Sequence, residues 1–343
     1  MSFVDEAISR LAISKAVAEL SAKFDHLTQL LEQQLAGKAA MAPGANPAAE
    51  LGFLGDHSNT IYRGFVGGER PLSSTPAAIP LTSTTCQQLH FSLDQYRFWI
   101  QAIKDRPRYH RKLWEFFYIS QVLYERNMLV PGRRGIGFGV GREPLPALFA
   151  SFGVEVVATD QSLEGAVRAG WASSNQHTTD LSILNERGIC TERMFGDLVS
   201  FAEADMNDID HKFDGRFDFC WSSCSLEHLG SLRHGMEFVK NSIRTLKPGG
   251  VAVHTTEFNL SSNDATYEYK DLSLYRRRDI DQLLEELSAE GHSPSPIRYN
   301  LGEGYAETVV DLPPYGRGEP HLRLRIADFD CTSVGIIVQK ALG

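Results

Sequence analysis

Between residues 135 and 258 the chain alternates short apolar runs with segments of helical character. The apolar runs are typical of buried strands, and helical segments lie between most of them. Strands and helices that alternate in this way predict a parallel sheet covered by helices on both faces. The expected strands are residues 135–139, 154–160, 199–205, 217–223 and 250–258, and the expected helices are 144–152, 163–171 and 230–246.

The two flanks of this alternation complete one α/β domain, which we place at residues 91–343. Residues 321–340 have the pattern of two strands around a short turn, which predicts that the sheet ends in an antiparallel hairpin. Residues 92–129 predict two helices, the first of them capped by Ser92.

The N-terminal part has a different character. In residues 1–38, apolar side chains recur at alternating steps of four and three, which is the seam of a coiled coil and predicts a helix that makes the protein a homo-oligomer. The alternative is an amphipathic helix that packs on its own subunit. Residues 39–90 are rich in Ala, Pro and Gly and predict a linker and irregular segment. The seam consists of Ile13, Val17, Leu20, Phe24, Leu27 and Leu31.

Composition excludes several classes of function. The chain has 343 residues and a formal net charge of −9, which argues against a general affinity for nucleic acid. No run of 18 apolar residues predicts a membrane span. The N-terminus lacks the apolar core of a signal peptide, and the five cysteines form no disulfide pattern. We therefore expect a cytoplasmic protein with reduced thiols.

Candidate ligand-binding residues follow the predicted strands, where a parallel sheet binds its ligands. Gly137, Gly139 and Gly141 let the backbone turn tightly or approach a ligand, although a buried glycine turn has the same pattern. Asp160 ends the second strand, where a carboxylate can accept both hydroxyls of a ribose. Asp205 ends the third strand and can bind an adenine amine or cap a helix.

The order of these features is the strongest functional signal. Glycine turn, strand-end Asp160 and Asp205, the pattern "FDxxxSxxxLEH", "LKPGG" and a terminal hairpin resemble class I S-adenosylmethionine-dependent methyltransferases over roughly residues 110–343. The resemblance implies a doubly wound, Rossmann-like seven-stranded sheet with an antiparallel C-terminal hairpin, and S-adenosylmethionine as the cofactor. It implies that Gly137, Gly139 and Gly141 line the cofactor, that Asp160 holds the ribose, that Asp205 and Met206 hold the adenine, and that Ser222 lies beside the sulfonium.

One position departs from that family pattern. The family usually has an acid two residues before the first glycine, as a partner for the cofactor's amino group, but this chain has Gly135 there. Glu143 is a candidate substitute. Alternatively, it is an acid in the first helical turn, favoured by the helix dipole and followed by Pro144.

Methyl transfer to a hydroxyl needs a group that takes or weakens its proton. Our candidates are Glu227 and His228 after the fourth strand and Glu257 in the fifth, although His228 can also cap the next helix. His254 points to the opposite face from Glu257 because their separation is odd. "LEH" also resembles part of the E-x-x-E-H metal site of some O-methyltransferases, but Cys224 replaces its first glutamate. A divalent metal is therefore possible but not favoured.

For the acceptor we expect a hydroxyl of a sugar or glycan-like small molecule. The polar, tyrosine-rich insertion at 259–278 and a narrower resemblance to bacterial methyltransferases of cell-surface polysaccharide synthesis favour it. An aromatic or natural-product hydroxyl and a non-catalytic cofactor-binding partner subunit are the alternatives. A nicotinamide-dependent oxidoreductase would lack "LKPGG" with a terminal hairpin. The candidate substrate residues are Tyr267, Tyr275, Arg277 and His177, the last in a loop with Trp171 and Gln176.

Overall fold

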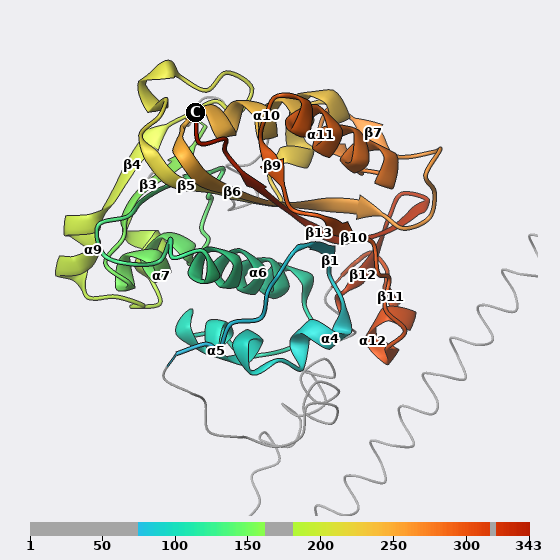
Figure 1. Ribbon diagram of the computed structural model, residues 1–343. Coiled ribbons are helices and arrows are strands. Elements are labelled where there is room, and N and C mark those ends of the chain that lie inside the picture. Colours follow the sequence, from blue (N-terminus) through green and yellow to red (C-terminus); the bar gives the residue numbers. More distant parts are fainter. Residues whose placement is uncertain (1–74, 162–180, 316–319) are drawn as a thin grey trace, which may run out of the picture. The chain divides into compact units, whose positions relative to one another are not determined.

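A mostly parallel sheet runs through the part of the chain that the computed structural model describes, residues 75–161, 181–315 and 320–343 (Figure 1). Its strands follow the order β10-β1-β13-β6-β5-β2-β3-β4. Each neighbouring pair from β6 to β4 is parallel. These strands are β2 (Arg134–Phe138), β3 (Glu155–Asp160), β4 (Val199–Glu203), β5 (Phe217–Ser223) and β6 (Leu246–Asn259).

The strand order reverses at β2. From β2 the chain passes to β3 and β4 on one side, then returns to β5 and β6 on the other. Loops that leave two adjacent parallel strands in opposite directions open a crevice between them. The sheet therefore offers a ligand site beyond the carboxyl ends of β2 and β5.

Beyond β6 the sheet becomes antiparallel. β13 (Phe329–Gln339) is antiparallel to β6 and also to β12 (Arg323–Ile326) and β1 (Ser83–Thr85). The sheet has eleven strands within the described residues, so the expected count of seven is too low. The remaining short elements are β7 (Glu268–Tyr269), β8 (Leu272–Ser273), β9 (Ser293–Pro294), β10 (Ile297–Arg298), β11 (Val310–Asp311), α12 (Tyr305–Thr308), η1 (Leu181–Asn185), η2 (His211–Phe213) and η3 (Leu226–His228).

The described part of the predicted irregular segment, residues 75–90, contributes to the sheet. β1 is fully buried, and α4 (Gln88–Phe91) follows it. The Ile337 amide donates to the Ser83 hydroxyl at 3.0 Å. β1 has the sequence Ser-Thr-Thr, without apolar residues or alternation, so no periodicity marks it as a strand. Ordered structure thus begins before residue 91.

Helices cover both faces of the sheet (Figure 1). One apolar cluster packs α5, α6, α7 and α9 on one face, and a second packs α10 and α11 on the other. No helix within the described residues is long and apolar enough to cross a bilayer. The helices are α5 (Asp94–Ala102), α6 (Arg111–Glu125), α7 (Leu145–Ser151), α9 (Glu192–Leu198), α10 (Leu232–Arg244) and α11 (Arg277–Ala289).

Most of the predicted elements that lie within the described residues are present. The five parallel strands, the helices at 144–152 and 230–246 and the two helices within 92–129 are confirmed. The cap at Ser92 is wrong: Leu93 is the N-cap of α5, and Ser92 ends α4, its hydroxyl donating to the Leu89 carbonyl at 2.7 Å. The predicted helices at 1–38 and 163–171, and the linker up to residue 74, lie outside the described residues.

The two glycines in β2, Gly135 and Gly137, make room for aromatic rings rather than for a ligand. Gly135 and Gly137 pair with Phe219 and Trp221 of β5, and alternate residues of paired strands share a face. A Cβ on Gly135 would lie 2.3 Å from the Phe219 ring, and one on Gly137 would lie 2.3 Å from the Trp221 ring. The acid expected at position 135 is therefore excluded by the Phe219 ring.

We expect Gly137→Ala to lower the free energy of unfolding by about 1–3 kcal/mol, because the new methyl group overpacks the core against Trp221. Urea denaturation followed by circular dichroism measures this. The control is Gly196→Ala in α9, where an added Cβ has no neighbour within 4 Å. Alanine there should be neutral or stabilising by up to ~1 kcal/mol. Equal stability of Gly137→Ala and wild type would contradict the packing argument.

Candidate functional site

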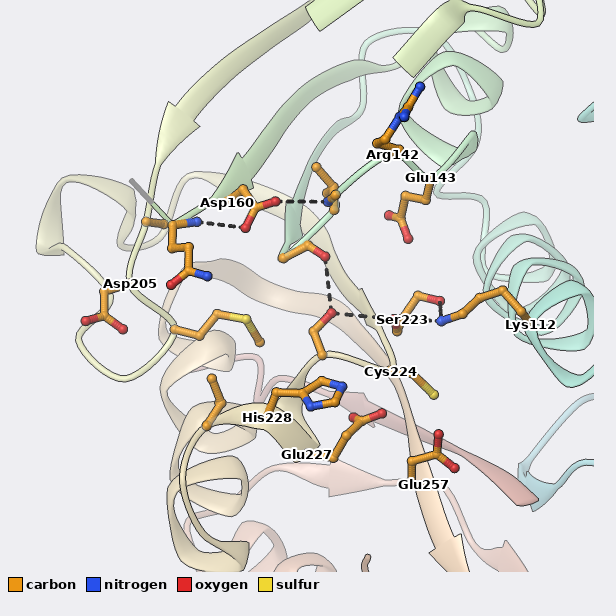
Figure 2. Close-up of a pocket in the computed structure, with 18 of the residues that line it drawn as sticks. Lys112, Arg142, Glu143, Asp160, Asp205, Ser223, Cys224, Glu227, His228 and Glu257 are labelled. Carbon is orange, nitrogen blue, oxygen red and sulfur yellow. Dashed lines mark hydrogen bonds between the residues drawn. The ribbon is translucent and has the colours of Figure 1, made fainter. Parts of the chain in front are cut away.

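A cavity of about 490 Å³ lies at the carboxyl ends of the parallel strands. This volume is in the range of small-molecule sites. The loops after β2, β3, β4 and β5 and the start of α6 contribute its walls (Figure 2). Its lining consists of Arg111, Lys112, Phe116, Gly139, Val140, Gly141, Arg142, Glu143, Asp160, Gln161, Ala204, Asp205, Met206, Asn207, Ser223, Cys224, Ser225, Glu227, His228, Leu229 and Glu257.

One end of the cavity is formed by the glycine turn and Asp160. Gly139 and Gly141 have φ values of 60° and 50°, a conformation that favours glycine. The Asp160 carboxylate accepts hydrogen bonds from the amides of Gly141 at 3.1 Å and Gln161 at 2.8 Å. These bonds fix the carboxylate at the cavity edge (Figure 2). The structure thus brings three predicted cofactor residues together.

Asp205 and Met206 line the same region of the cavity. The Asp205 carboxylate accepts from the Asn207 amide at 2.8 Å within a turn. No helix begins at Asp205, because η2 starts at His211 and has Asp210 as its N-cap. Interpreting Asp205 as a helix cap is therefore wrong. The Met206 sulfur packs beside Gly139, which joins this wall to the glycine turn.

Glu143 points into the cavity from the loop before α7 (Figure 2). It precedes Pro144, the N-cap of α7, and the first turn of that helix contains no acid, so the first-turn interpretation is wrong. Its carboxyl accepts from the Trp221 indole N–H at 2.6 Å. Burial raises the pKa of Glu143 to about 8 despite that bond. A positively charged ligand group beside Glu143 would lower this pKa and favour the ionised carboxylate.

The structure does not bring two of the predicted cofactor residues to the cavity wall. Gly137 lies under Trp221, as described above. Ser222 is fully buried and its hydroxyl is bonded to His254 Nδ1 at 2.8 Å, on the other face of β5. Its neighbour Ser223 faces the cavity instead.

The opposite end of the cavity is a polar floor, which we define as Arg111, Lys112, Glu115, Cys224, Glu227 and Glu257. Figure 2 shows Cys224, Glu227 and Glu257 side by side there, with Lys112 near Ser223. Glu115 is bonded to Lys112 at 2.7 Å and to Arg111 at 3.2 Å. Arg111 also forms an ion pair with Glu257. Glu257 and Glu227, two of the predicted catalytic residues, therefore share one subsite.

The charges on this floor are strongly coupled. Burial alone would raise the pKa of Glu115, but Lys112 and Arg111 outweigh it and lower that pKa to about 2. Burial raises the pKa of Glu257, although Arg111 opposes the shift. Burial and the nearby Glu115 raise the pKa of the Cys224 thiol well above its usual value. The floor thus holds an anionic Glu115 and a neutral thiol.

His228 also lines the cavity, from the short helix η3. Its Nδ1 donates to the Asp271 carbonyl at 2.6 Å, which leaves Nε2 as the basic nitrogen. His254, by contrast, is fully buried and bonded through both ring nitrogens to Ser222 and Ser242. Burial lowers the pKa of His254 to about 3, so it is a core histidine.

The predicted substrate residues are not part of this cavity. Tyr275 is buried, and its hydroxyl donates to backbone carbonyls of Leu226 and Leu232 at 3.4 and 3.3 Å. Arg277 is exposed and pairs with Asp281, and Tyr267 stacks on Tyr269. The insertion at 259–278 therefore supports η3 and α10 instead of contributing to the cavity lining. His177, with Trp171 and Gln176, lies outside the described residues.

Sequence reasoning missed the contribution of α6. Arg111 and Lys112 occupy its first turn, where the helix dipole disfavours positive charge, and Glu115 one turn later compensates them. Glu115 is fully buried, and most of the residues that follow it in α6 are apolar. That single acid in "RKLWEFFYIS" is the signal that points to a buried charged site.

One group of potential metal ligands lies within the described residues. Donor atoms of Cys224, Glu227 and Glu257 lie within 4.8 Å of one another. A thiol binds metal as the thiolate, and the raised pKa of Cys224 opposes that state. Arg111 already neutralises Glu257. The donor set fits a divalent metal poorly.

Comparison with known sequences indicates the type of domain. Residues 135–254 match the sequence model of a family described as a methyltransferase domain. No curated protein matches the chain.

Solved structures with a similar fold include three of low identity. A 1,6-didemethyltoxoflavin-N1-methyltransferase from Burkholderia thailandensis, with S-adenosylhomocysteine bound, is 15% identical over 80% of this chain and 100% of its own, with a TM-score of 0.40. A SAM-dependent methyltransferase from Methanosarcina mazei is 13% identical over 64% and 97%, with a TM-score of 0.40. The [4+2]-cyclase SpnF is 17% identical over 84% and 94%, with a TM-score of 0.43.

These comparisons do not identify an acceptor and give no support to the narrower resemblance to polysaccharide-associated enzymes. The matched segment runs from the first residues of β2 into β6 and so includes the glycine turn, Asp160, Asp205 and Glu227. Residues 135–254 are thus similar to a methyltransferase domain, in agreement with the S-adenosylmethionine cofactor that the sequence implies.

Proposed function

We propose that this protein is an S-adenosylmethionine-dependent methyltransferase that methylates a hydroxyl of a sugar or glycan-like small molecule. One observation carries the proposal: a single cavity has the glycine turn, Asp160 and Asp205 at one end and a polar floor with two carboxylates at the other. The first end suits a nucleoside, and the second suits a polar acceptor.

Each residue at the nucleoside end has an assigned role. Asp160 accepts the ribose hydroxyls, since two amides already orient its carboxylate. Asp205 accepts from the adenine amine, and Met206 covers the ring. Gly139 and Gly141 admit the cofactor close to the backbone. Glu143 takes the partner role for the amino group that Gly135 cannot fill.

When bound, the cofactor supplies an electrophilic methyl group on a sulfonium. The protein's part is to hold the acceptor oxygen in line with that methyl and to accept its proton. Glu227, His228 and Glu257 all line the cavity and are the candidates for this step. Glu257 also orients Arg111, so it contributes to the shape of the floor in either case.

The polar floor supports a sugar-like acceptor more directly than the tyrosine-rich insertion, whose predicted substrate residues do not line the cavity. An aromatic or natural-product hydroxyl is the alternative acceptor. We expect the reaction to take place in the cytoplasm, where sugar precursors and the cofactor are available.

Calorimetry with S-adenosylmethionine and S-adenosylhomocysteine tests the cofactor, and we expect micromolar binding of both. Mass spectrometry of glycans and small metabolites, with and without the gene, tests the acceptor. The expected result is a loss of 14 daltons on a sugar. A missing methyl group on RNA, protein or lipid would rule out the sugar, and absence of cofactor binding would rule out the whole proposal.

We also expect a homo-oligomer, most simply a dimer, through the apolar seam in residues 13–31. Deleting residues 1–38 should lower the mass measured by light scattering and leave cofactor binding intact. A control that replaces the polar residues Glu19 and Gln29 with alanine should keep the mass unchanged. An unchanged mass after the deletion would mean that the seam does not join subunits.

A further inference from the structure

Glu227 is a buried carboxylate with an unused oxygen on the cavity floor. Its side chain is 0% exposed, and its Oε2 accepts from the Thr256 hydroxyl at 3.0 Å. Its Oε1 is also buried and has no hydrogen-bond partner among the described residues. A carboxylate oxygen without a donor inside a protein costs free energy unless a ligand or water satisfies it.

The other carboxylates of the floor are already satisfied. Glu115 accepts from Ser333 at 2.6 Å and Ser223 at 3.1 Å in addition to its two cations. Glu257 has Arg111 and the thiol of Cys331. Three carboxylates face two cations in this network, and Glu227 is the one that has no cation paired with it among the described residues.

Two further features of the same floor support a binding role. Arg111 lines the cavity, and its Nε has no acceptor among the described residues. Cys224 has a φ of 48°, a strained backbone conformation for a residue other than glycine. Its sulfur lies within 4.8 Å of carboxylate oxygens of Glu227 and Glu257. Strain of this kind persists where the surrounding structure fixes a functional arrangement.

An unused acceptor and an unused donor on one floor match a hydroxyl, which both donates and accepts. An ammonium group only donates, and once held by Glu227 it has no lone pair for attack. A carboxylate or phosphate would add charge to a floor that already has a negative excess.

We propose that Glu227 Oε1 accepts the proton of an uncharged acceptor hydroxyl, and that this floor selects neutral acceptors over anionic ones. The inference rests on the proposed function. In the transfer, the acceptor oxygen forms a bond to the methyl carbon while the carbon–sulfur bond breaks and its electron pair stays on sulfur. The hydroxyl proton passes to Glu227. The positive charge of the sulfonium and the unbalanced charge of Glu227 disappear together.

The test uses the full-length protein and three sets of glycosides: methyl glucoside and methyl galactoside, their 6-amino-6-deoxy analogues, and the methyl glycosides of the corresponding free uronic acids, whose carboxylates are ionised at neutral pH. Formation of S-adenosylhomocysteine measures turnover. We expect turnover with a neutral glycoside and a kcat/KM at least tenfold lower with the matching uronate.

Glu227→Gln should lower kcat by a factor of about 100 or more while KM for the glycoside and Kd for S-adenosylhomocysteine change less than threefold. Glu227→Asp, which keeps the carboxylate, should retain part of kcat and guards against misfolding of the glutamine variant. Glu303→Gln, at an exposed position outside the cavity, is the matched control and should behave as wild type.

Several results would overturn the inference: equal or faster turnover of the uronate, turnover of the amino sugars alone, no turnover of any glycoside, or an unchanged kcat in Glu227→Gln. Titration with MnCl₂ is a further test of the inference. Binding of Mn²⁺ that is lost in Glu227→Gln, together with activity that requires the ion, would make the floor a metal site. If S-adenosylhomocysteine still binds in these cases, the proposed cofactor function stands and only the acceptor inference fails.

Discussion

Asp160→Ala is expected to weaken the binding of S-adenosylhomocysteine by more than tenfold. The carboxylate is held at the end of β3 by the amides of Gly141 and Gln161, so it is oriented before the ligand arrives. Alanine removes the acceptor for the ribose hydroxyls and also releases the Gly141 amide that shapes the glycine turn. A hydrogen bond to a charged group contributes about 1.5–3 kcal/mol, which corresponds to a factor of roughly 10–150 in affinity.

Isothermal titration calorimetry at pH 7.5 measures this loss. Glu203→Ala is the matched control, since Glu203 ends the neighbouring strand β4, is exposed and does not line the cavity. The control should bind as wild type does. An Asp160→Ala protein that folds normally and binds with unchanged affinity would mean that the nucleoside lies elsewhere.

The parallel sheet and its strand-end residues could be predicted from sequence because both depend on local patterns. Long apolar runs mark buried parallel strands, and Asp160 and Asp205 follow them directly. Once the strands are parallel, their carboxyl ends must meet at one edge. That geometry brings Asp160, Asp205 and Glu227 to one cavity although Glu227 lies 67 positions after Asp160 in the chain.

The errors arise where tertiary packing decides between equivalent local patterns. Gly137 and Gly139 look alike in sequence, yet one makes room for the Trp221 ring and the other adopts positive φ. Ser222 and Ser223 are adjacent, and the pleat of β5 alone determines that the second faces the cavity. Tyr275 lies in a polar insertion, but its side chain is buried and its hydroxyl fills the space beside Gly235.

The contribution of α6 to the polar floor could not be predicted, because α6 is distant in sequence from the other members of the floor. Arg111 and Glu115 precede the matched family region, and they meet Cys224 and Glu257 only after the sheet has formed. A buried acid in an apolar helix indicates that some partner exists, but no spacing rule identifies it. Such ion pairs between segments therefore require the structure.

We expect Glu143→Gln to abolish a pH dependence of the free energy of unfolding that extends through the neutral range. In the folded protein the Glu143 carboxyl has a pKa of about 8, compared with a usual value of 4.5. Above pH 4.5 the unfolded chain loses this proton while the folded chain keeps it, so the unfolded state binds fewer protons. The free energy of unfolding therefore falls as the pH rises from about 4.5 to 8, by at most about 1.4 kcal/mol per pH unit.

Urea denaturation of wild type and variant at pH 5 and pH 8 isolates this contribution, because other titrating groups cancel in the difference. The stability of Glu143→Gln relative to wild type should increase by about 3 kcal/mol between the two pH values. Glu186→Gln changes an exposed acid that pairs with Arg142; it provides the control and should show no comparable change of stability with pH. A constant difference would mean that Glu143 is ionised in the free protein.

Cofactor binding should ionise Glu143. An ammonium group beside Glu143 favours its carboxylate, so binding of S-adenosylhomocysteine at pH 6.5 should release about one proton. Calorimetry in phosphate and in imidazole, whose ionisation heats differ, counts the protons from the change in observed enthalpy. In Glu143→Gln the count should fall to near zero and the affinity should become nearly independent of pH between 5.5 and 7.5. Equal proton release in both proteins would assign it to another group and leave the amino group of the cofactor without Glu143 as its partner.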